Sequence, residues 1–369
     1  MADDAFRFAD ELGPISIFHV HRPAAGLRAI VVVDNVAGGP AIGGARMAPD
    51  VSLEECVRLA RAMTFKSAAA GLPHGGGKSV IFADPRMAPA QKERLMRAFA
   101  HAIADVRDYI VGPDMGTDER CMAWAKDEIG RAVGLPRELG GIPLDEIGAT
   151  GFGLAVAAEV AAEFCGLDLK GARVAVQGFG AVGRHAARFL AERGAKVVAV
   201  ADSRGTIIAP DGLDVGALAA LKAAGRSVTD HAGGKAGDRD AIVGVACDIW
   251  IPAARPDVLH ADNIGRLDTR IVLSGANIPM TPETEAALYD RGVLCVPDFI
   301  ANAGGLICAA VEYRGGTEGM AFATIDEKVR ANVRSVLGRA RDQGSAPRAA
   351  AVAMAEERVR TAMALRRFG

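Results

Sequence analysis

The sequence predicts an α/β protein of two domains, and three observations support this prediction. The chain has 369 residues, a length typical of about two domains that each bury a core. Apolar segments rich in β-branched residues, such as 27–35, alternate with amphipathic helical segments. In the middle of the chain, residues 171–202 read as strand, glycine turn, helix and second strand, which is the order of a βαβ unit.

The composition excludes several classes of protein. Charged residues make up 24% and the formal net charge is −2, which gives no electrostatic reason to expect nucleic-acid or membrane binding. The six cysteines contain no C-x-x-C pair, so we expect no metal site, no disulfide framework and a reducing, cytoplasmic compartment. The first residues lack the apolar region of a signal peptide, and no uncharged run approaches the ~18 apolar residues of a membrane span.

The first third of the chain predicts a helix, a glycine-rich loop and a strand that each end near a charged residue. Ser52, followed three residues later by Glu55, is typical of a helix start, and this helix would carry Lys66 near its C-terminal part. The glycine loop would deliver Lys78, and the strand "YIVGPDM" would end at Asp114.

Lys66 and Lys78 are separated by small residues at 68–70 and 75–77 that would leave both ammonium groups open to one small anion. Three consecutive glycines usually mark a close backbone approach or a positive φ. Solvated surface lysines are the alternative. A nucleotide-triphosphate loop is disfavoured because Leu72 stands where its first glycine should be. Two cations beside the carboxylate of Asp114 indicate chemistry on an amino or keto acid.

Gly178, Gly180 and Gly183 form G-x-G-x-x-G directly after an apolar strand and at the start of a helix. In this context the glycines provide a tight turn, room for a pyrophosphate and close helix–strand packing, which predicts a Rossmann-type dinucleotide site. The free N–H groups at the helix start, around Ala181 and Val182, would bind the phosphates.

Asp202 ends the second strand of this unit, where a carboxylate can accept the ribose hydroxyls; a plain turn residue is the alternative. Because a carboxylate repels a 2′-phosphate, the cofactor is predicted to be NAD, with NADP as the alternative. We expect the first domain at 1–140 and the dinucleotide-binding domain at 141–329, with helices of about 330–369 returning to the first domain.

With these motifs the chain resembles the family of glutamate, leucine, phenylalanine and valine dehydrogenases over nearly its whole length. "MTFKSAAAGLPHGGGK" resembles the leucine and phenylalanine branch, whereas "GATGFG", "VAVQGFGAVGRHAA", "GAN" and "IANAGG" are similar to glutamate dehydrogenases. The resemblance implies an active-site cleft between the two domains. It also implies NAD-dependent, reversible oxidative deamination of an L-amino acid to a 2-oxo acid and ammonium.

By position, the resemblance implies that Lys66 binds the substrate α-carboxylate, that Lys78 activates water and that Asp114 relays protons. A lysine crowded by a second cation and partly desolvated can act as a base near neutral pH. Asn302 would orient the substrate and Asn277 would lie beside the nicotinamide ribose. A third contact, from Thr150, would reach the carboxamide.

The side-chain pocket is also interpreted through the resemblance. In glutamate-specific members a further lysine and a serine bind the side-chain carboxylate, and here Ile42 and Ala309 stand at those positions. Leu306 would add apolar wall and Gly112 would leave room. Burying a carboxylate without a partner costs several kcal/mol, so a non-acidic substrate with an apolar aliphatic or aromatic side chain is predicted. The alternative is that these are plain core residues.

Other interpretations stay open at this stage. Asp118 and Glu119 are interpreted as a helix N-terminus, or else as a bias toward a basic substrate. His74 is expected to pack the glycine segment or face solvent. Competing functions are a dehydrogenase of an unusual amino or imino acid and a non-catalytic nucleotide-sensing protein. We expect a homo-oligomer.

Overall fold

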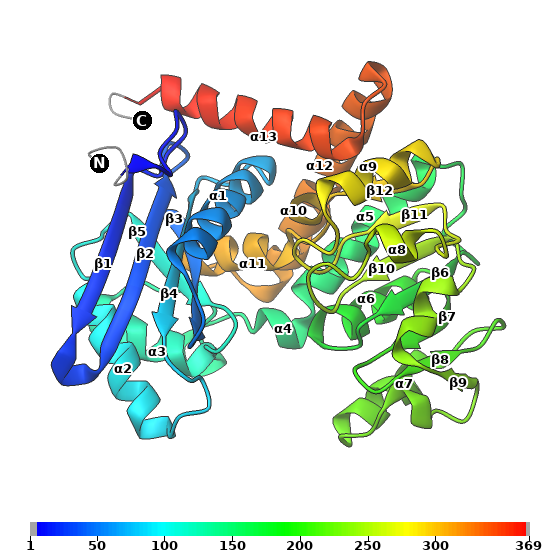
Figure 1. The fold of residues 1–369 in the computed structure, drawn as a ribbon, viewed down its shortest axis with the longest axis horizontal. Coiled ribbons are helices and arrows are strands. Elements are labelled where there is room, and N and C mark those ends of the chain that lie inside the picture. Colours follow the sequence, from blue (N-terminus) through cyan, green and yellow to red (C-terminus); the bar gives the residue numbers. More distant parts are fainter. Residues whose placement is uncertain (1–5, 367–369) are drawn as a thin grey trace. The chain divides into compact units, whose positions relative to one another are not determined.

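The computed structural model describes residues 6–366 and divides into two compact units, each built on one sheet (Figure 1). The first unit comprises Met1–Pro143, Leu306–Ala321 and Ala353–Gly369, and the second comprises Leu144–Gly305 and Phe322–Val352. Both units combine a sheet with helices, so the α/β class is confirmed. No helix of residues 6–366 is long and apolar enough to cross a membrane.

The first unit contains a five-stranded sheet in the order β1-β2-β4-β3-β5. Strand β2 is antiparallel to both β1 and β4, whereas β3 is parallel to both β4 and β5. The strands are β1 Ser16–Arg22, β2 Leu27–Asn35, β3 Ala41–Ala48, β4 Gly75–Phe82 and β5 Tyr109–Pro113. The helices that follow them are α1 Leu53–Ala69, α2 Pro89–Ala102 and α3 Glu119–Ile129.

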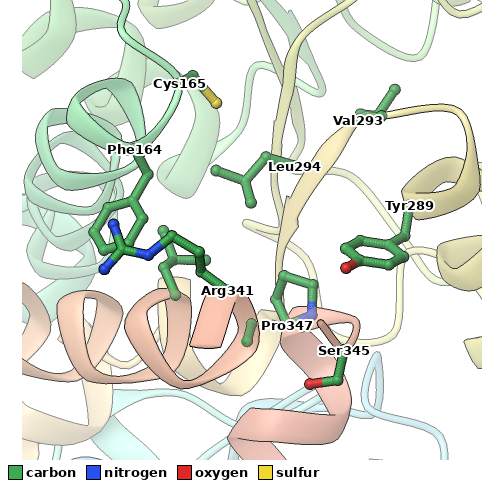
Figure 2. A pocket seen from close by; sticks show the side chains of 11 residues that line it. Phe164, Cys165, Tyr289, Val293, Leu294, Arg341, Ser345 and Pro347 are labelled. Carbon is green, nitrogen blue, oxygen red and sulfur yellow. The ribbon is translucent and has the colours of Figure 1, made fainter. Parts of the chain in front are cut away.

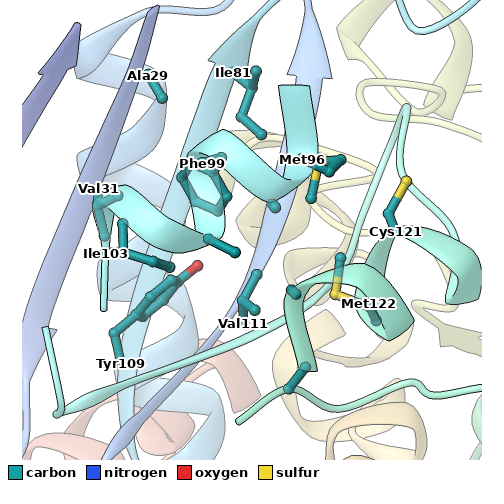
Figure 3. Close-up of a cluster of buried hydrophobic side chains, with 14 of the residues drawn as sticks. Ala29, Val31, Ile81, Met96, Phe99, Ile103, Tyr109, Val111, Cys121 and Met122 are labelled. Carbon is teal, nitrogen blue, oxygen red and sulfur yellow. The ribbon is translucent and has the colours of Figure 1, made fainter. Parts of the chain in front are cut away.

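Alternating side chains of β2 bury both faces of this sheet. Val31 packs with Phe99 and Met122 in a core under α2 and α3 (Figure 3). Its neighbour Val32 belongs to a second cluster, which includes Cys56 of α1. Each fully buried side chain of this size contributes about 1.5–3 kcal/mol. The sheet is therefore a rigid middle layer, and α1 covers the face opposite to α2 and α3.

The second unit contains a seven-stranded sheet in the order β12-β11-β10-β6-β7-β8-β9. The first five strands of this order are parallel, and β8 and β9 add an antiparallel edge. The strands are β6 Arg173–Gln177, β7 Lys196–Ala201, β8 Thr206–Ile208, β9 Lys235–Gly237, β10 Ile249–Pro252, β11 Ile271–Leu273 and β12 Leu294–Val296. The chain order reverses beside β6, and ligands of open α/β sheets bind at the carboxyl ends of strands at such a point.

Helices complete the second unit and connect it to the first. Those up to the last strand are α4 Leu144–Ile147, α5 Ala149–Phe164, α6 Ala181–Glu192, α7 Val215–Ala223, α8 Ala261–Ile264 and α9 Pro282–Asp290. The helices after it are α10 Asp298–Ala301, α11 Gly304–Tyr313, α12 Glu318–Gln343 and α13 Pro347–Ala364. Short 3-10 helices lie at Pro23–Ala25, Arg137–Leu139, Val228–Asp230 and Arg239–Gly244.

The C-terminal helices divide between the units at different points from those expected. Residues 322–352 group with the second unit, because α12 carries Arg330 and Arg334, which pair with Glu159 and Glu163 of α5 at 2.6 and 2.8 Å. The final segment from Ala353 groups with the first unit. The segment between α7 and β10 contains the edge strand β9 and the 3-10 helices Val228–Asp230 and Arg239–Gly244.

His185 of α6 is buried against the start of α5. An added Cβ on Gly148 would come within 2.3 Å of its imidazole, and one on Gly151 within 2.7 Å of its Cβ, so both glycines are required for this packing. Burial, together with the nearby Arg188 and Arg184, lowers the pKa of His185 to about 4. The folded protein therefore keeps this imidazole neutral at physiological pH.

We predict that His185 makes the protein less stable in mild acid. The unfolded chain takes up a proton near the ordinary histidine pKa of about 6.5, whereas the folded protein resists it down to about 4, so the stability that is complete above about 6.5 falls between these values. His185→Leu should flatten this part of the profile of unfolding temperature against pH. Parallel profiles for the wild type and the variant from pH 7 to 4 would contradict the assignment.

Candidate active site

The ion pair of Lys78 and Asp114 is the central feature of the first unit. Lys78 lies in the middle of β4 and is only 6% exposed, and Asp114 directly follows β5. The ammonium of Lys78 contacts Asp114 Oδ2 across the intervening strand β3. Arg46 of β3 donates from Nε to the same oxygen at 3.2 Å. Three adjacent strands thus bring two cations to one carboxylate.

The charges of this cluster fix the ionisation of Asp114. Burial alone would raise the pKa of its carboxyl group, but Lys78 and then Arg46 outweigh burial and hold the pKa below its ordinary value. Asp114 is therefore a carboxylate at neutral pH, in direct contact with an ammonium that can exchange a proton with it.

The glycines before Lys78 lie in a strand, and the prediction of a glycine loop is wrong. Gly75–Gly77 begin β4, which pairs with β2 on one side and β3 on the other. An added Cβ on Gly76 would lie 2.0 Å from the backbone nitrogen of Thr64 in α1, and one on Gly77 would lie 2.9 Å from the ring of Tyr109. The glycines are needed because neighbouring elements approach the strand closely, not because the chain turns.

Lys66 lies in the last turn of α1, as predicted, and Ser52 accepts the N–H of Glu55 at 3.1 Å at the start of this helix. Helix α1 packs on the face of β4 that carries Val80. Because side chains alternate along a strand, Lys78 points to the same face as Val80. Both lysines are therefore on the side of the sheet that α1 covers.

The residues assigned to a side-chain pocket are all buried. The register pairs Ile42 of β3 with Gly76, and Gly44 with Gly112 of β5, so these positions share the face of Lys78. Leu306 and Ala309 lie in α11 and are 6% and 5% exposed. Burial agrees equally with a pocket wall and with plain core packing.

Arg46 is the functional candidate that sequence reasoning missed. The glycines of the segment "AGGPAIGGARM" look like those of a turn, but Ala41–Ala48 forms the inner strand β3, between β4 and β5. Ile42, Gly44 and Arg46 occupy alternate positions on this strand, and the alternation of side chains with a period of two is the sequence feature that could have predicted it. An added Cβ on Gly44 would lie 2.8 Å from the Cβ of Asp114, which explains the glycine.

In the second unit the glycine motif has the geometry of a phosphate cradle. Gly178 follows β6 with a φ of 97°, and an added Cβ there would lie 2.8 Å from Ala253. A Cβ on Gly183 would lie 1.8 Å from the carbonyl oxygen of Gly178. Nothing lies within 4 Å of a Cβ on Gly180, so this side stays open to a ligand. Ala181 begins α6, and Val182 follows in its first turn.

The carboxylate of Asp202 is occupied by groups of its own unit. It accepts hydrogen bonds from Lys222 Nζ at 2.9 Å, from Ser227 Oγ at 3.0 Å, and from the backbone N–H groups of Val228 and Arg204 at 3.1 and 2.9 Å. Burial opposes ionisation, but these donors outweigh it and lower the pKa of Asp202 to about 2.

A pocket of about 380 Å³ lies at the carboxyl ends of β6, β7 and β10, beside the glycine turn. Its lining includes Asp202, Ser203 and three cationic side chains, those of Lys222, Arg239 and Arg255.

Asn302 and Asn277 meet in the second unit. The amide nitrogen of Asn302 donates to Asn277 Oδ1 at 2.9 Å and to the carbonyl of Gly275 at 3.3 Å. The Oδ1 of Asn302 is buried and finds no hydrogen-bond partner among residues 6–366. Thr150 lies in the first turn of α5, where an added Cβ on Gly305 would come within 2.9 Å of its hydroxyl. Within the described part of the chain, no cluster of His, Cys, Asp and Glu could hold a metal.

Comparison with known proteins assigns the family. Residues 140–367 match the Glutamate/Leucine/Phenylalanine/Valine dehydrogenase family, and residues 15–131 match its dimerisation domain. The chain belongs to this family. It is an amino acid dehydrogenase, an oxidoreductase that acts on CH–NH2 groups, and the family uses NAD or NADP.

Relatives with high similarity are glutamate dehydrogenases. The enzyme of Aeropyrum pernix is 39% identical over 90% of this chain and 85% of its own. The NADP(+)-dependent enzyme of Pyrobaculum calidifontis is 40% identical over 76% of this chain and 71% of its own. Among solved structures, the hetero-hexameric enzyme of Thermus thermophilus, in its leucine-bound form, has a TM-score of 0.84 at 33% identity, covering 95% of this chain and 90% of that one.

The prediction of a non-acidic substrate is wrong. Relatives about 40% identical over most of the chain are glutamate dehydrogenases, which take an acidic amino acid. The error came from treating positions 42 and 309 as the only places where a second carboxylate could be bound. An apolar residue at one position excludes a contact there and leaves other positions open.

We predict that Asp114→Asn removes about 3 kcal/mol of stability at pH 7, because it leaves Lys78 buried without its partner. The pKa of Asp114 is lowered in the folded protein, so this contribution is complete above the ordinary value of about 3.9 and is lost as the pH falls through the lower, folded value. The gap in unfolding free energy between wild type and variant should stay constant from pH 8 to 5. A gap that closes between pH 7 and 5 would contradict the direction of the shift.

Proposed function

We propose that this dehydrogenase catalyses the reversible oxidative deamination of L-glutamate to 2-oxoglutarate and ammonium. The observation that carries the reaction class is the buried contact between Lys78 and Asp114, in a chain that belongs to an amino acid dehydrogenase family. Similarity to glutamate dehydrogenases over most of the chain supports the substrate.

In this proposal Lys66 binds the α-carboxylate, and Lys78 and Asp114 transfer protons. The open cradle at Gly180 would hold the diphosphate of a nicotinamide dinucleotide, which would supply the acceptor for the α-hydride of the substrate. Loss of the hydride and of an N–H proton converts the amine into an imine. Asp114 takes this N–H proton. Lys78, as its free amine, takes a proton from the water that adds to the imine carbon, and Asp114 passes its proton to the nitrogen, which gives a carbinolamine. Asp114 then accepts the hydroxyl proton while Lys78 protonates the nitrogen, so the carbonyl forms as the C–N bond breaks and ammonia leaves.

The side-chain carboxylate of glutamate needs a partner other than Ile42 and Ala309. Cationic side chains of the first unit are the groups that can supply one, and Arg46 is 16% exposed on the face of the sheet that carries Lys78. Its guanidinium already contacts Asp114 and Glu55. A second carboxylate would therefore add to an existing cluster of opposite charges.

For the cofactor we infer NADP as the preferred form, which reverses the preference for NAD predicted from Asp202 alone. The carboxylate of Asp202 is neutralised by Lys222, and Arg239, Arg255 and Ser203 line the same pocket. A phosphate monoester carries about two negative charges near pH 7, which three cationic side chains can bind. The NADP(+)-dependent relative of Pyrobaculum calidifontis supports this choice.

The assembly is inferred to be a homo-oligomer formed through the first unit. The match of residues 15–131 to a dimerisation domain supports this inference, as does the hexameric assembly of the Thermus thermophilus relative.

We predict that purified protein oxidises L-glutamate, and reduces 2-oxoglutarate with ammonium, faster than it converts leucine, valine, phenylalanine, tryptophan or lysine. The measurement is the change in nicotinamide absorbance with each substrate. Lys78→Ala should lower kcat by at least about a thousandfold, because it removes the proposed base, while cofactor binding survives. Turnover of an apolar amino acid with none of glutamate would overturn the substrate, and full activity of Lys78→Ala would overturn the mechanism.

We predict that Lys222→Ala raises KM for NADP about tenfold, the effect of losing about 1.4 kcal/mol of binding. KM for NAD should change little, since its ribose carries no phosphate in this pocket. Lys196→Ala is the matched control, because Lys196 starts β7 while Asp202 follows the other end of that strand. Equal effects of Lys222→Ala on both cofactors would count against a phosphate contact.

A further inference from the structure

Ile278 adopts a backbone conformation that β-branched residues rarely adopt. Its φ is 50°, and Asp257 is the other non-glycine residue of the described chain with a positive φ. Such a residue costs free energy and persists when its surroundings hold it firmly. Ile278 directly follows Asn277, so its conformation fixes the direction of the chain at that asparagine.

Asp298 holds Ile278 in this conformation. The backbone N–H of Ile278 donates to Asp298 Oδ2 at 2.9 Å. The other carboxylate oxygen of Asp298 accepts from Arg348 Nη2 at 3.0 Å, and Arg348 also pairs through Nε with Glu285. Residues of α9, α10 and α13 therefore meet in one buried cluster, all of it within the second unit.

This cluster contains one guanidinium between two carboxylates. The side chains of Glu285 and Asp298 are 3% and 11% exposed, and that of Arg348 is 23% exposed. Burial raises the pKa of Glu285, and the attraction of Arg348 opposes that rise. Removing the guanidinium would leave two buried carboxylates close together, and Asp298 could then no longer keep its place beneath Ile278.

Asp298 also fixes Asn302, from the other side. The backbone N–H of Asn302 donates to the carbonyl of Asp298 at 2.8 Å at the end of α10, and its side chain donates to Asn277 Oδ1 at 2.9 Å. The two asparagines are thus joined by a hydrogen bond, and both are connected to Asp298: Asn302 directly, and Asn277 through its neighbour Ile278. The hydrogen bond between the asparagines also sets the direction in which the unpaired, buried Oδ1 of Asn302 points.

We propose that Arg348 is a positioning residue that, through Asp298 and Ile278, orients Asn277 and Asn302 for binding the nicotinamide cofactor. The proposal rests on the proposed dehydrogenase function and on the places that the resemblance implies for the two asparagines, Asn277 beside the nicotinamide ribose and Asn302 beside the substrate. Arg348 belongs to the segment after α12, remote in sequence from the asparagines, and its side chain bonds to Asp298 and Glu285. Its effect is transmitted by a single carboxylate and one strained residue.

The first experiment compares Arg348→Met, Arg348→Lys and Arg341→Met. Arg341 is the matched control: it borders the pocket of Phe164, Leu294 and Pro347 (Figure 2), its side chain is 73% exposed and it pairs only weakly with the exposed Asp342. Nicotinamide binding is measured directly by fluorescence titration with NADPH and NADH, without a substrate. This readout is independent of the amino acid that the enzyme takes, so a failure of the glutamate proposal leaves it intact.

Arg348→Met should weaken cofactor binding about ten- to a hundredfold, the scale on which displaced binding groups lose function. KM for the amino acid should rise as well, because Asn302 is expected to orient the substrate. Arg348→Lys should fall between Met and wild type, because lysine keeps the charge but cannot bridge two carboxylates as a planar fork does. Arg341→Met should bind as the wild type does. Unchanged cofactor binding in a folded Arg348→Met variant would overturn the proposal.

The second experiment separates positioning from plain stabilisation. Ile278→Gly is combined with Arg348→Met, because glycine adopts a φ near 50° without strain and depends less on Asp298 to hold it. The double variant should recover part of the lost cofactor affinity. If binding instead follows the unfolding temperature across all variants and glycine restores none of it, Arg348 is merely structural and the proposal fails.

Discussion

The buried contact between Lys78 and Asp114 is the interaction on which the architecture of the first unit depends. An unpaired charge at so buried a position would cost several kcal/mol, so the two strands that carry them must be held in fixed register. Strand β3 lies between them, and Gly44 leaves the space that the Asp114 side chain occupies. Gly76 and Gly77 similarly let α1 and Tyr109 close on β4. Side chains at these three positions would push apart the elements that pack around the ion pair, so glycine is needed at each of them.

The same constraint recurs in the second unit, where the buried carboxylates near the strand ends are paired or bonded. Asp202 is held by Lys222, and Asp298 by Arg348. In each case the carboxylate lies just after a strand and its cation comes from a later helix. A charge that is costly to bury therefore fixes a loop at the sheet edge where ligands of this fold class bind. The ion pairs that neutralise these buried carboxylates therefore also fix the positions of the backbone segments that border the site.

Local patterns predicted the elements that rest on local interactions. The start of α1 at Ser52 and the turn at Gly178 follow from capping and glycine geometry, which act over a few residues. Strand β3 was missed because its glycines look like a turn, and their purpose, space for Asp114, is a contact across the sheet. Apart from the nearby Arg204, the partners of Asp202 lie 20 to 26 residues further on, and Arg348 lies 50 residues from Asp298. Such contacts are set by the fold, so no window along the sequence contains them.

The substrate shows a different limit of sequence reasoning. A residue that is present, such as Lys78, can be assigned a task because its charge must be satisfied somewhere. A residue that is absent, such as a lysine at position 42, excludes one contact and leaves every other group of the site available. Similarity over 76–90% of the chain weighs all positions together, and it favours glutamate although Ile42 is buried and apolar. Specificity is a difference between total binding free energies, so every charged group of the site, Arg46 included, contributes to it together with the missing lysine.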